Sequence, residues 1–197
     1  MTDIWRSTLD PVFYPAVNEV QAEASGVGWA AIWAGAVTAI AISLVLLAIG
    51  AGFGLAAVSP WPGVGPSATT FSIGAGIWLI VMQWLSSAVG GYLAGRMRTR
   101  WYSLHGDETF FRDTAQGLIT WALATIVVAG VAVLISALAG FAAPPLPDDP
   151  SLTAAAAEEA RKAATTVALF TGFSMLLGAF IASVSAVIGG RLRDRHP

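Results

Sequence analysis

The chain contains no cysteine and little charge. Among its 197 residues, 11% are charged, whereas a soluble domain carries roughly a quarter. Without cysteine there is neither a disulfide framework nor a thiolate site. Only two histidines are present, and the sequence contains no phosphate-binding loop, nucleophile elbow or zinc-protease helix motif. We therefore expect no enzymatic activity, no cofactor, no metal and no nucleic-acid partner.

The charged residues are also absent from three long stretches, 24–95, 114–147 and 163–190. Apolar stretches of about 18 or more residues are candidates for membrane-spanning helices. The proline-rich and glycine-rich sequence SPWPGVGPS at 59–67 divides the first stretch, because it breaks helical geometry. We predict an all-α membrane protein with four transmembrane helices, at about Gly28–Val58, Phe71–Gly95, Ala115–Ala142 and Ala164–Gly190.

Basic residues predict the orientation of these spans. Most of the arginines lie near the N-terminus, in the loop after the second span, and at the C-terminus. Lys and Arg are enriched on the cytoplasmic side of membrane proteins. We therefore expect a multi-pass protein of the bacterial cytoplasmic (inner) membrane with both termini in the cytoplasm. A cleaved signal peptide is not expected, because the first apolar stretch is too long and follows a polar segment.

Two similar endings indicate an internal repeat. The sequence GGYLAGRMRTR at 90–100 resembles SAVIGGRLRDR at 185–195, with Gly95 and Gly190 in equivalent positions. We predict two helical hairpins related as a parallel repeat. The predicted units are a cytoplasmic interfacial segment at 1–26, a first hairpin at 27–96, a cytoplasmic loop at 97–113, and a second hairpin at 114–197 with an outer helical extension near 150–163. The alternative is that such endings arise twice by chance in helices rich in Ala and Gly.

Small residues recur at every fourth position in the second and fourth spans, so that they share one helix face. In membranes, small side chains allow close backbone approach, which provides much of the attraction between helices. We expect these two spans to pack against each other. The candidate packing residues are Gln83, Ser87, Gly91, Gly95, Ser174, Gly178, Ala182, Ala186 and Gly190.

The arginines that follow these two spans have two interpretations. They mark the points where the helices leave the hydrocarbon, or they bind anionic lipid headgroups or an acidic surface of a partner. The candidate residues are Arg96, Arg98, Arg100, Arg191, Arg193 and Arg195.

Two further groups of polar residues are candidates for chemistry. Gln83 lies near the middle of its span, where it either forms a helix–helix hydrogen bond or lines a narrow pore. The loop residues His105, Asp107 and Glu108 include ligand types that bind metals, but their spacing fits no closed ligand set. A solvated loop, with Asp113 near the start of the third span, is the simpler interpretation.

The sequence FSIGAGIWLIVMQWLSSAVGGYLAGRMRTR, followed by QGLITWALATIVV and preceded by GWAAIWAGAV, resembles a group of small bacterial inner-membrane proteins labelled PhnA-like or hypothetical. The resemblance covers roughly residues 28–140. It implies a multi-pass membrane protein without an established activity. The label suggests phosphonate metabolism, which no residue here supports. The family's usual His-Gly pair before the third span is replaced by Gln116-Gly117, which argues against a histidine role.

These observations favour a non-enzymatic structural or accessory subunit of a homo-oligomer or of a larger membrane complex. Its expected partners are membrane lipids, anionic ones among them, and other membrane subunits or further copies of the chain. The alternative is a small channel or transporter whose pathway runs near the pseudo-two-fold axis and Gln83.

Overall fold

The computed structural model describes residues 26–59, 61, 64–99, 106–140 and 150–195. Within these ranges the chain forms four helices and no strand: α2 (Trp29–Ala57), α3 (Ala68–Met97), α4 (Gly106–Gly140) and α5 (Pro150–Arg195). All four are long and apolar enough to cross a membrane. The prediction of an all-helical chain with four such helices is confirmed, and it is consistent with a multi-pass membrane protein. Nearly all of the predicted interfacial segment, residues 1–25, lies outside the described residues.

Two helices extend beyond the predicted spans. α4 begins at Gly106, inside the stretch predicted as a loop. Asp107 and Glu108 lie in its first turn, where negative charge is favourable to the helix dipole. Arg112 Nε donates to Glu108 Oε1 at 2.7 Å, a pair spaced for one helix face. α5 runs without interruption from Pro150, so the outer extension and the fourth span form one helix.

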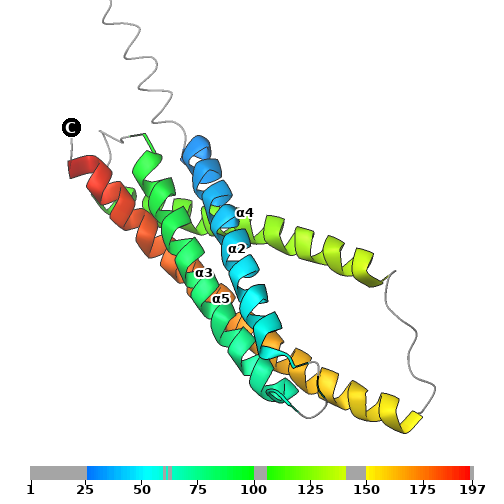
Figure 1. The fold of residues 1–197 in the computed structure, drawn as a ribbon. Helices are drawn as coiled ribbons and strands as arrows, with labels where there is room; N and C mark the ends of the chain where they lie inside the picture. The colour runs from blue at the N-terminus through cyan, green and yellow to red at the C-terminus, as the bar shows by residue number, and fades with distance from the viewer. Residues whose placement is uncertain (1–25, 60, 62–63, 100–105, 141–149, 196–197) are drawn as a thin grey trace, which may run out of the picture.

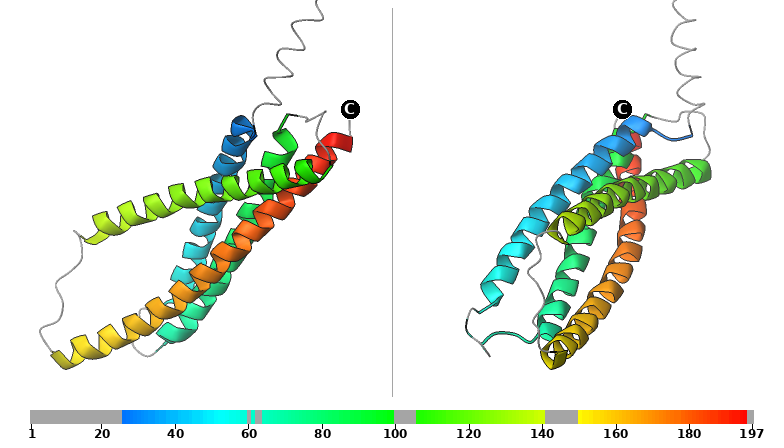
Figure 2. Two further views of the ribbon diagram at one scale, coloured as in Figure 1. Left: turned by 180° about the vertical axis from the view of Figure 1, so that it is seen from behind. Right: turned by 90° about the vertical axis from the view of Figure 1, so that its right-hand side faces the viewer.

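The helices differ in how closely they lie together. α3 runs beside both α2 and α5, whereas α4 crosses the others near one end of the molecule and then diverges from them (Figures 1 and 2). The start of α2, the end of α3, the start of α4 and the end of α5 all lie at that end. We call it the arginine end, because Arg96, Arg98, Arg191, Arg193 and Arg195 belong to it.

The interior is built from small side chains and the surface from large ones. The buried apolar residues are mostly alanines, among them Ala36, Ala94 and Ala182. Large apolar side chains point outward, as Leu176 does with 75% of its surface exposed. This distribution suits a lipid environment, in which exposed leucine carries no penalty and helices attract one another by close packing.

The closest approach is between α3 and α5, which share the largest helix–helix contact. A Cβ added at Gly91 would lie 2.7 Å from the Cα of Ala182, and one added at Gly95 would lie 2.7 Å from the carbonyl carbon of Ala186. Real Cβ atoms essentially never approach other atoms so closely. These two glycines therefore permit backbone contact that any side chain would prevent.

The two predicted hairpins close differently. α2 stays beside α3 toward the outer end, where Trp78 Nε1 donates to the carbonyl oxygen of Leu46 at 3.0 Å. The C-terminal half of α4 instead stands away from α5 (Figure 2), and Ile126 and Val133 there are largely exposed. The parallel repeat therefore stays a prediction.

Candidate functional site

At the arginine end, Arg98 is the C-cap residue of α3, and only 1% of its surface is exposed. Its guanidinium is shared between two carboxylates. Nε and Nη2 donate to the two oxygens of Asp113, with Nη2 at 3.1 Å from Oδ2. Nη2 also donates to Asp194 Oδ2 at 2.8 Å. Arg98 thus joins the end of α3 to the start of α4 and the end of α5.

A glycine on α5 makes room for this ion pair. The Asp113 side chain is 2% exposed, and a Cβ added at Gly190 would lie 2.7 Å from its Cγ. A buried carboxylate is tolerated only with charged and hydrogen-bonded partners, which Arg98 supplies. The simpler interpretation of Asp113, as a solvated residue near a helix start, is therefore replaced by that of a buried ion-pair partner.

The same geometry changes the interpretation of Arg98. The hypothesis that it binds lipid headgroups does not fit its position, because its side chain is fully buried and faces two carboxylates. Burial alone lowers the pKa of Arg98, but the hydrogen bonds and charges of Asp113 and Asp194 raise it above the usual value. The guanidinium of Arg98 therefore stays charged at physiological pH.

Gln116 forms a second link at this end. Its amide nitrogen donates to the carbonyl oxygen of Ala94 at 2.6 Å, and its Oε1 accepts from the backbone N–H of Gly28 at 3.1 Å. The residue is fully buried. One side chain of α4 thus contacts α3 and the residue before α2. Both its donor and its acceptor are used, which is the satisfied arrangement that a buried amide requires.

The remaining predicted arginines are more accessible. Arg191 is exposed, with its guanidinium 5.8 Å from the ring centre of Phe110. Arg195 is exposed, and Arg96 and Arg193 are half-buried. Arg100 and His105 lie outside the described residues. Asp107 and Glu108 are exposed, and the residues that the structure describes contain no group of His, Cys, Asp and Glu able to hold a metal ion.

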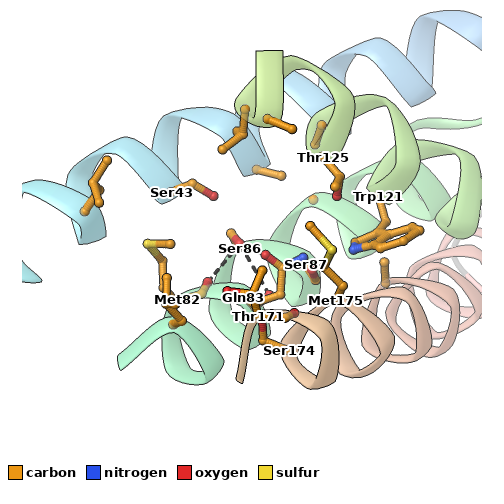
Figure 3. Close-up of a pocket in the computed structure, with 18 of the residues that line it drawn as sticks. Ser43, Met82, Gln83, Ser86, Ser87, Trp121, Thr125, Thr171, Ser174 and Met175 are labelled. Carbon is orange, nitrogen blue, oxygen red and sulfur yellow. Dashed lines mark hydrogen bonds between the residues drawn. The ribbon is translucent and has the colours of Figure 1, made fainter. Parts of the chain in front are cut away.

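Several of the predicted packing residues line a cavity that the sequence did not predict. The cavity, of about 460 Å³, lies among all four helices, and Figure 3 shows the side chains that line it. Gln83, Ser87, Gly91, Ser174 and Ala182 contribute to its wall. Gly178 lies beside it, because a Cβ added there would be 2.7 Å from Gln83 Cγ. Gly95, Ala186 and Gly190 lie nearer the arginine end.

The cavity wall is mostly apolar but contains a set of hydroxyl, amide and indole groups. It includes no charged residue. Gln83 is part of this wall. The sequence suggested that Gln83 either forms a helix–helix hydrogen bond or lines a narrow pore. The polar neighbours of Gln83 come from every helix, and they are Ser43, Ser86, Ser87, Thr120, Trp121, Thr125, Thr171 and Ser174. These polar side chains come together because of the way the four helices cross, and the sequence of a single span does not show that crossing.

Comparison of the chain with protein-family models, with curated proteins and with solved structures finds no match. The resemblance to the PhnA-like group therefore stays a prediction.

The ion-pair cluster predicts a specific pattern of stability. Asp113→Leu should lower the free energy of unfolding by about 3 kcal/mol, near the lower end for breaking a buried ion pair, because Asp194 still faces Arg98. The double variant Arg98→Met/Asp113→Leu should lose less than Asp113→Leu alone, since no buried charge is left with a partner missing. Unfolding followed by circular dichroism in detergent micelles measures both.

Asp107→Leu is the matched control, because Asp107 is an exposed carboxylate in the first turn of the same helix. Its effect should stay within about 0.5 kcal/mol. Equal losses for Asp107→Leu and Asp113→Leu would contradict the assignment of Arg98 and Asp113 as a stabilising buried pair.

Proposed function

We propose that the chain is a non-enzymatic subunit of the bacterial inner membrane, with both termini in the cytoplasm, that assembles with further copies of itself or with other membrane subunits. The observation that supports this proposal is the outer half of α4, which extends from the bundle without a helical neighbour along its exposed face among the described residues (Figure 1). The buried ionisable residues Arg98 and Asp113 serve to hold helices together, which is the role expected in a structural subunit.

The exposed face of α4 contains a small residue of the kind that favours helix association. Gly130 lies in the outer half of α4, and a Cβ added there would meet no atom within 4 Å. A glycine inside a helix costs about 1 kcal/mol relative to alanine, and close approach of another helix is a common reason for its presence in a membrane span. A neighbouring subunit seated on Gly130 would also hold α4 in place.

The accessible arginines fit the same proposal. Arg96, Arg191 and Arg195 lie at the arginine end, which we assign to the cytoplasmic side on the basis of the positive-inside rule. There they are placed to contact anionic headgroups, each contributing about 1 kcal/mol near the membrane surface. Arg98 has no part in this contact.

A cysteine-free chain allows a direct test of the α4 face. Gly130→Cys should form an intermolecular disulfide under mild oxidation in native membranes if the neighbour is a second copy. If the neighbour is another protein, a maleimide photo-crosslinker attached to the introduced thiol should yield a heavier adduct of defined mass. Leu176→Cys is the control, because Leu176 is a highly exposed residue on α5 and should give neither product.

The outcome that contradicts the subunit proposal is also defined. The proposal is contradicted if the Gly130→Cys variant gives neither a disulfide nor an adduct and if native mass spectrometry of gently solubilised membranes shows the chain as a monomer without partners.

The cavity favours a second candidate, a small channel or transporter with a pathway past Gln83. Secondary transporters commonly bind their substrates near the bilayer midplane, and Gln83 lies close to the middle of α3. The arginine end is closed in this structure. A Cβ added at Gly117 would lie 2.7 Å from the Cβ of Ala186, and Gln116 connects α4 to α3. Conduction would require these contacts to separate.

For this candidate, liposomes that contain the chain should leak a small solute or ion, and Gln83→Leu should change the rate of the leak several-fold. Thr38→Val is the control, since Thr38 bonds to its own helix at the carbonyl oxygen of Ala34 and does not line the cavity. Liposomes as tight as protein-free ones would contradict the channel candidate and leave the subunit proposal unaffected.

A further inference from the structure

The cavity among the four helices contains polar groups to which the described part of the chain supplies no hydrogen-bond partner. Some of its hydroxyls bond to their own helix, as Ser86 does to the carbonyl oxygen of Met82 at 2.8 Å. Others make no side-chain hydrogen bond to any described residue. These are Ser43, Gln83, Ser87, Trp121, Thr125 and Thr171, and of their polar atoms the indole nitrogen of Trp121 is fully buried. They belong to four different helices and meet at one place (Figure 3).

Such a cluster is costly inside a membrane. The hydrocarbon offers no water, so a polar group without a partner there carries a substantial free-energy penalty. By contrast, the buried side chains of Gln116 and Arg98 at the arginine end are paired. The unpaired groups in the cavity therefore indicate that something else occupies it and supplies the missing partners.

The wall restricts the charge of the occupant. No Asp, Glu, Lys, Arg or His among the described residues lines the cavity, and an ion without a counter-charge is strongly disfavoured at this depth. The occupant is therefore uncharged. Its polar part is small, since most of the wall is apolar, and the cavity of about 460 Å³ lies within the range of sites for small molecules, roughly 300–1,000 Å³.

The depth of the cavity determines whether its occupant is a phospholipid or a molecule dissolved in the hydrocarbon. Gln83 lies near the middle of α3, about half the thickness of the hydrocarbon from either interface. The ester and headgroup atoms of a phospholipid stay at the interface, so they do not reach Gln83. A molecule that dissolves completely in the hydrocarbon does reach it.

The donors of the cavity define the complementary chemistry. The Gln83 amide has two N–H donors and calls for acceptor oxygens, while Trp121 Nε1, also a donor, is buried beside it without a partner among the described residues. The two groups converge on one wall, since a Cβ added at Gly178 would lie 2.7 Å from Gln83 Cγ and 2.9 Å from Trp121 Nε1. Met82 and Met175 flank the cavity (Figure 3), and methionine adapts readily to a flat ring.

We propose that this cavity binds an uncharged, lipid-soluble ring compound with carbonyl acceptors, of the quinone class. Its carbonyl oxygen accepts from the Gln83 amide, its ring lies against Met175 and the indole of Trp121, and its apolar tail leaves along α4. The route for the tail is lateral, because Ala129 and Val133 of α4 line the cavity and are themselves exposed. The proposal concerns binding alone and is independent of whether the chain assembles with a partner.

The test uses the full chain in lipid nanodiscs and decylubiquinone as the probe, with tryptophan fluorescence as the readout. Quinones quench indole emission on contact, and Trp121→Phe identifies the part of the signal that comes from Trp121. The wild-type chain should show saturable quenching. Gln83→Met, which keeps the side-chain shape and removes the amide, should weaken binding about tenfold, as expected for loss of one hydrogen bond to a buried group.

A second pair of variants places a leucine at two different glycines of α5, one beside the cavity and one away from any neighbouring atom. Gly178→Leu places a side chain against Gln83 and should abolish saturable quenching, whereas Gly172→Leu should bind normally because a Cβ added at Gly172 meets no atom within 4 Å. If Gly178→Leu fails to fold, Thr125→Val, which removes one hydroxyl of the wall at constant shape, takes its place and should weaken binding measurably.

Three results would overturn the proposal. Quenching that rises linearly with the probe and equally in every variant would show partitioning into the bilayer only. Equal competition by an alkylbenzene of the same tail length would show that the cavity accepts any apolar chain and that the acceptor oxygens have no role. An unchanged affinity of Gln83→Met for the probe would likewise show that the Gln83 amide does not bind it and serves only in contact between helices.

Discussion

The structure depends on the backbone contact between α3 and α5. In a bilayer, burying leucine gives helices little attraction, so their association rests on close packing and polar contacts. Gly91 and Gly95 allow α3 to reach the backbone of α5 at Ala182 and Ala186. The other interactions at the arginine end follow from this approach, because it brings Asp194 and Gly190 of α5 next to Arg98 and Asp113.

The four helices that are long and apolar enough to cross a membrane could be predicted from the sequence, because length and hydropathy are properties of each segment alone. The small residues of the α3–α5 contact were also indicated, through their four-residue spacing. The role of Arg98 could not be assigned, since an arginine after an apolar span has the same pattern whether it faces water, a headgroup or a carboxylate. Asp113 offers one signal of its role, because it directly precedes a long stretch without charged residues and a carboxylate buried there requires a charged or hydrogen-bonded partner.

The cavity illustrates the other limit of sequence reasoning. Gln83 stands out as a polar residue at mid-span, but Ser43, Trp121 and Thr171 do not, because each is ordinary within its own helix. They become a site only through the crossing of α4 over the other helices, which no local pattern encodes. The parallel repeat stays a prediction for a related reason: similar helix endings do not determine whether the outer halves of two hairpins close in the same way.

The two ends of the molecule therefore differ in character. At the arginine end, Arg98, Asp113 and Gln116 are satisfied by their hydrogen bonds and fix the helices. Farther along, several polar groups of the cavity have no hydrogen-bond partner among the described residues, and the outer half of α4 lies apart from the bundle (Figure 2). The proposed occupant and the proposed neighbouring subunit would bind there.

The most direct test of the α3–α5 contact is solid-state NMR of the full chain in bilayers, with glycine and alanine labelled with carbon-13. Through-space cross peaks are expected between Gly95 and Ala186 and between Gly91 and Ala182. If the assigned spectra show glycine–alanine contacts only within each helix, α3 and α5 do not meet through these residues, and the central claim is wrong.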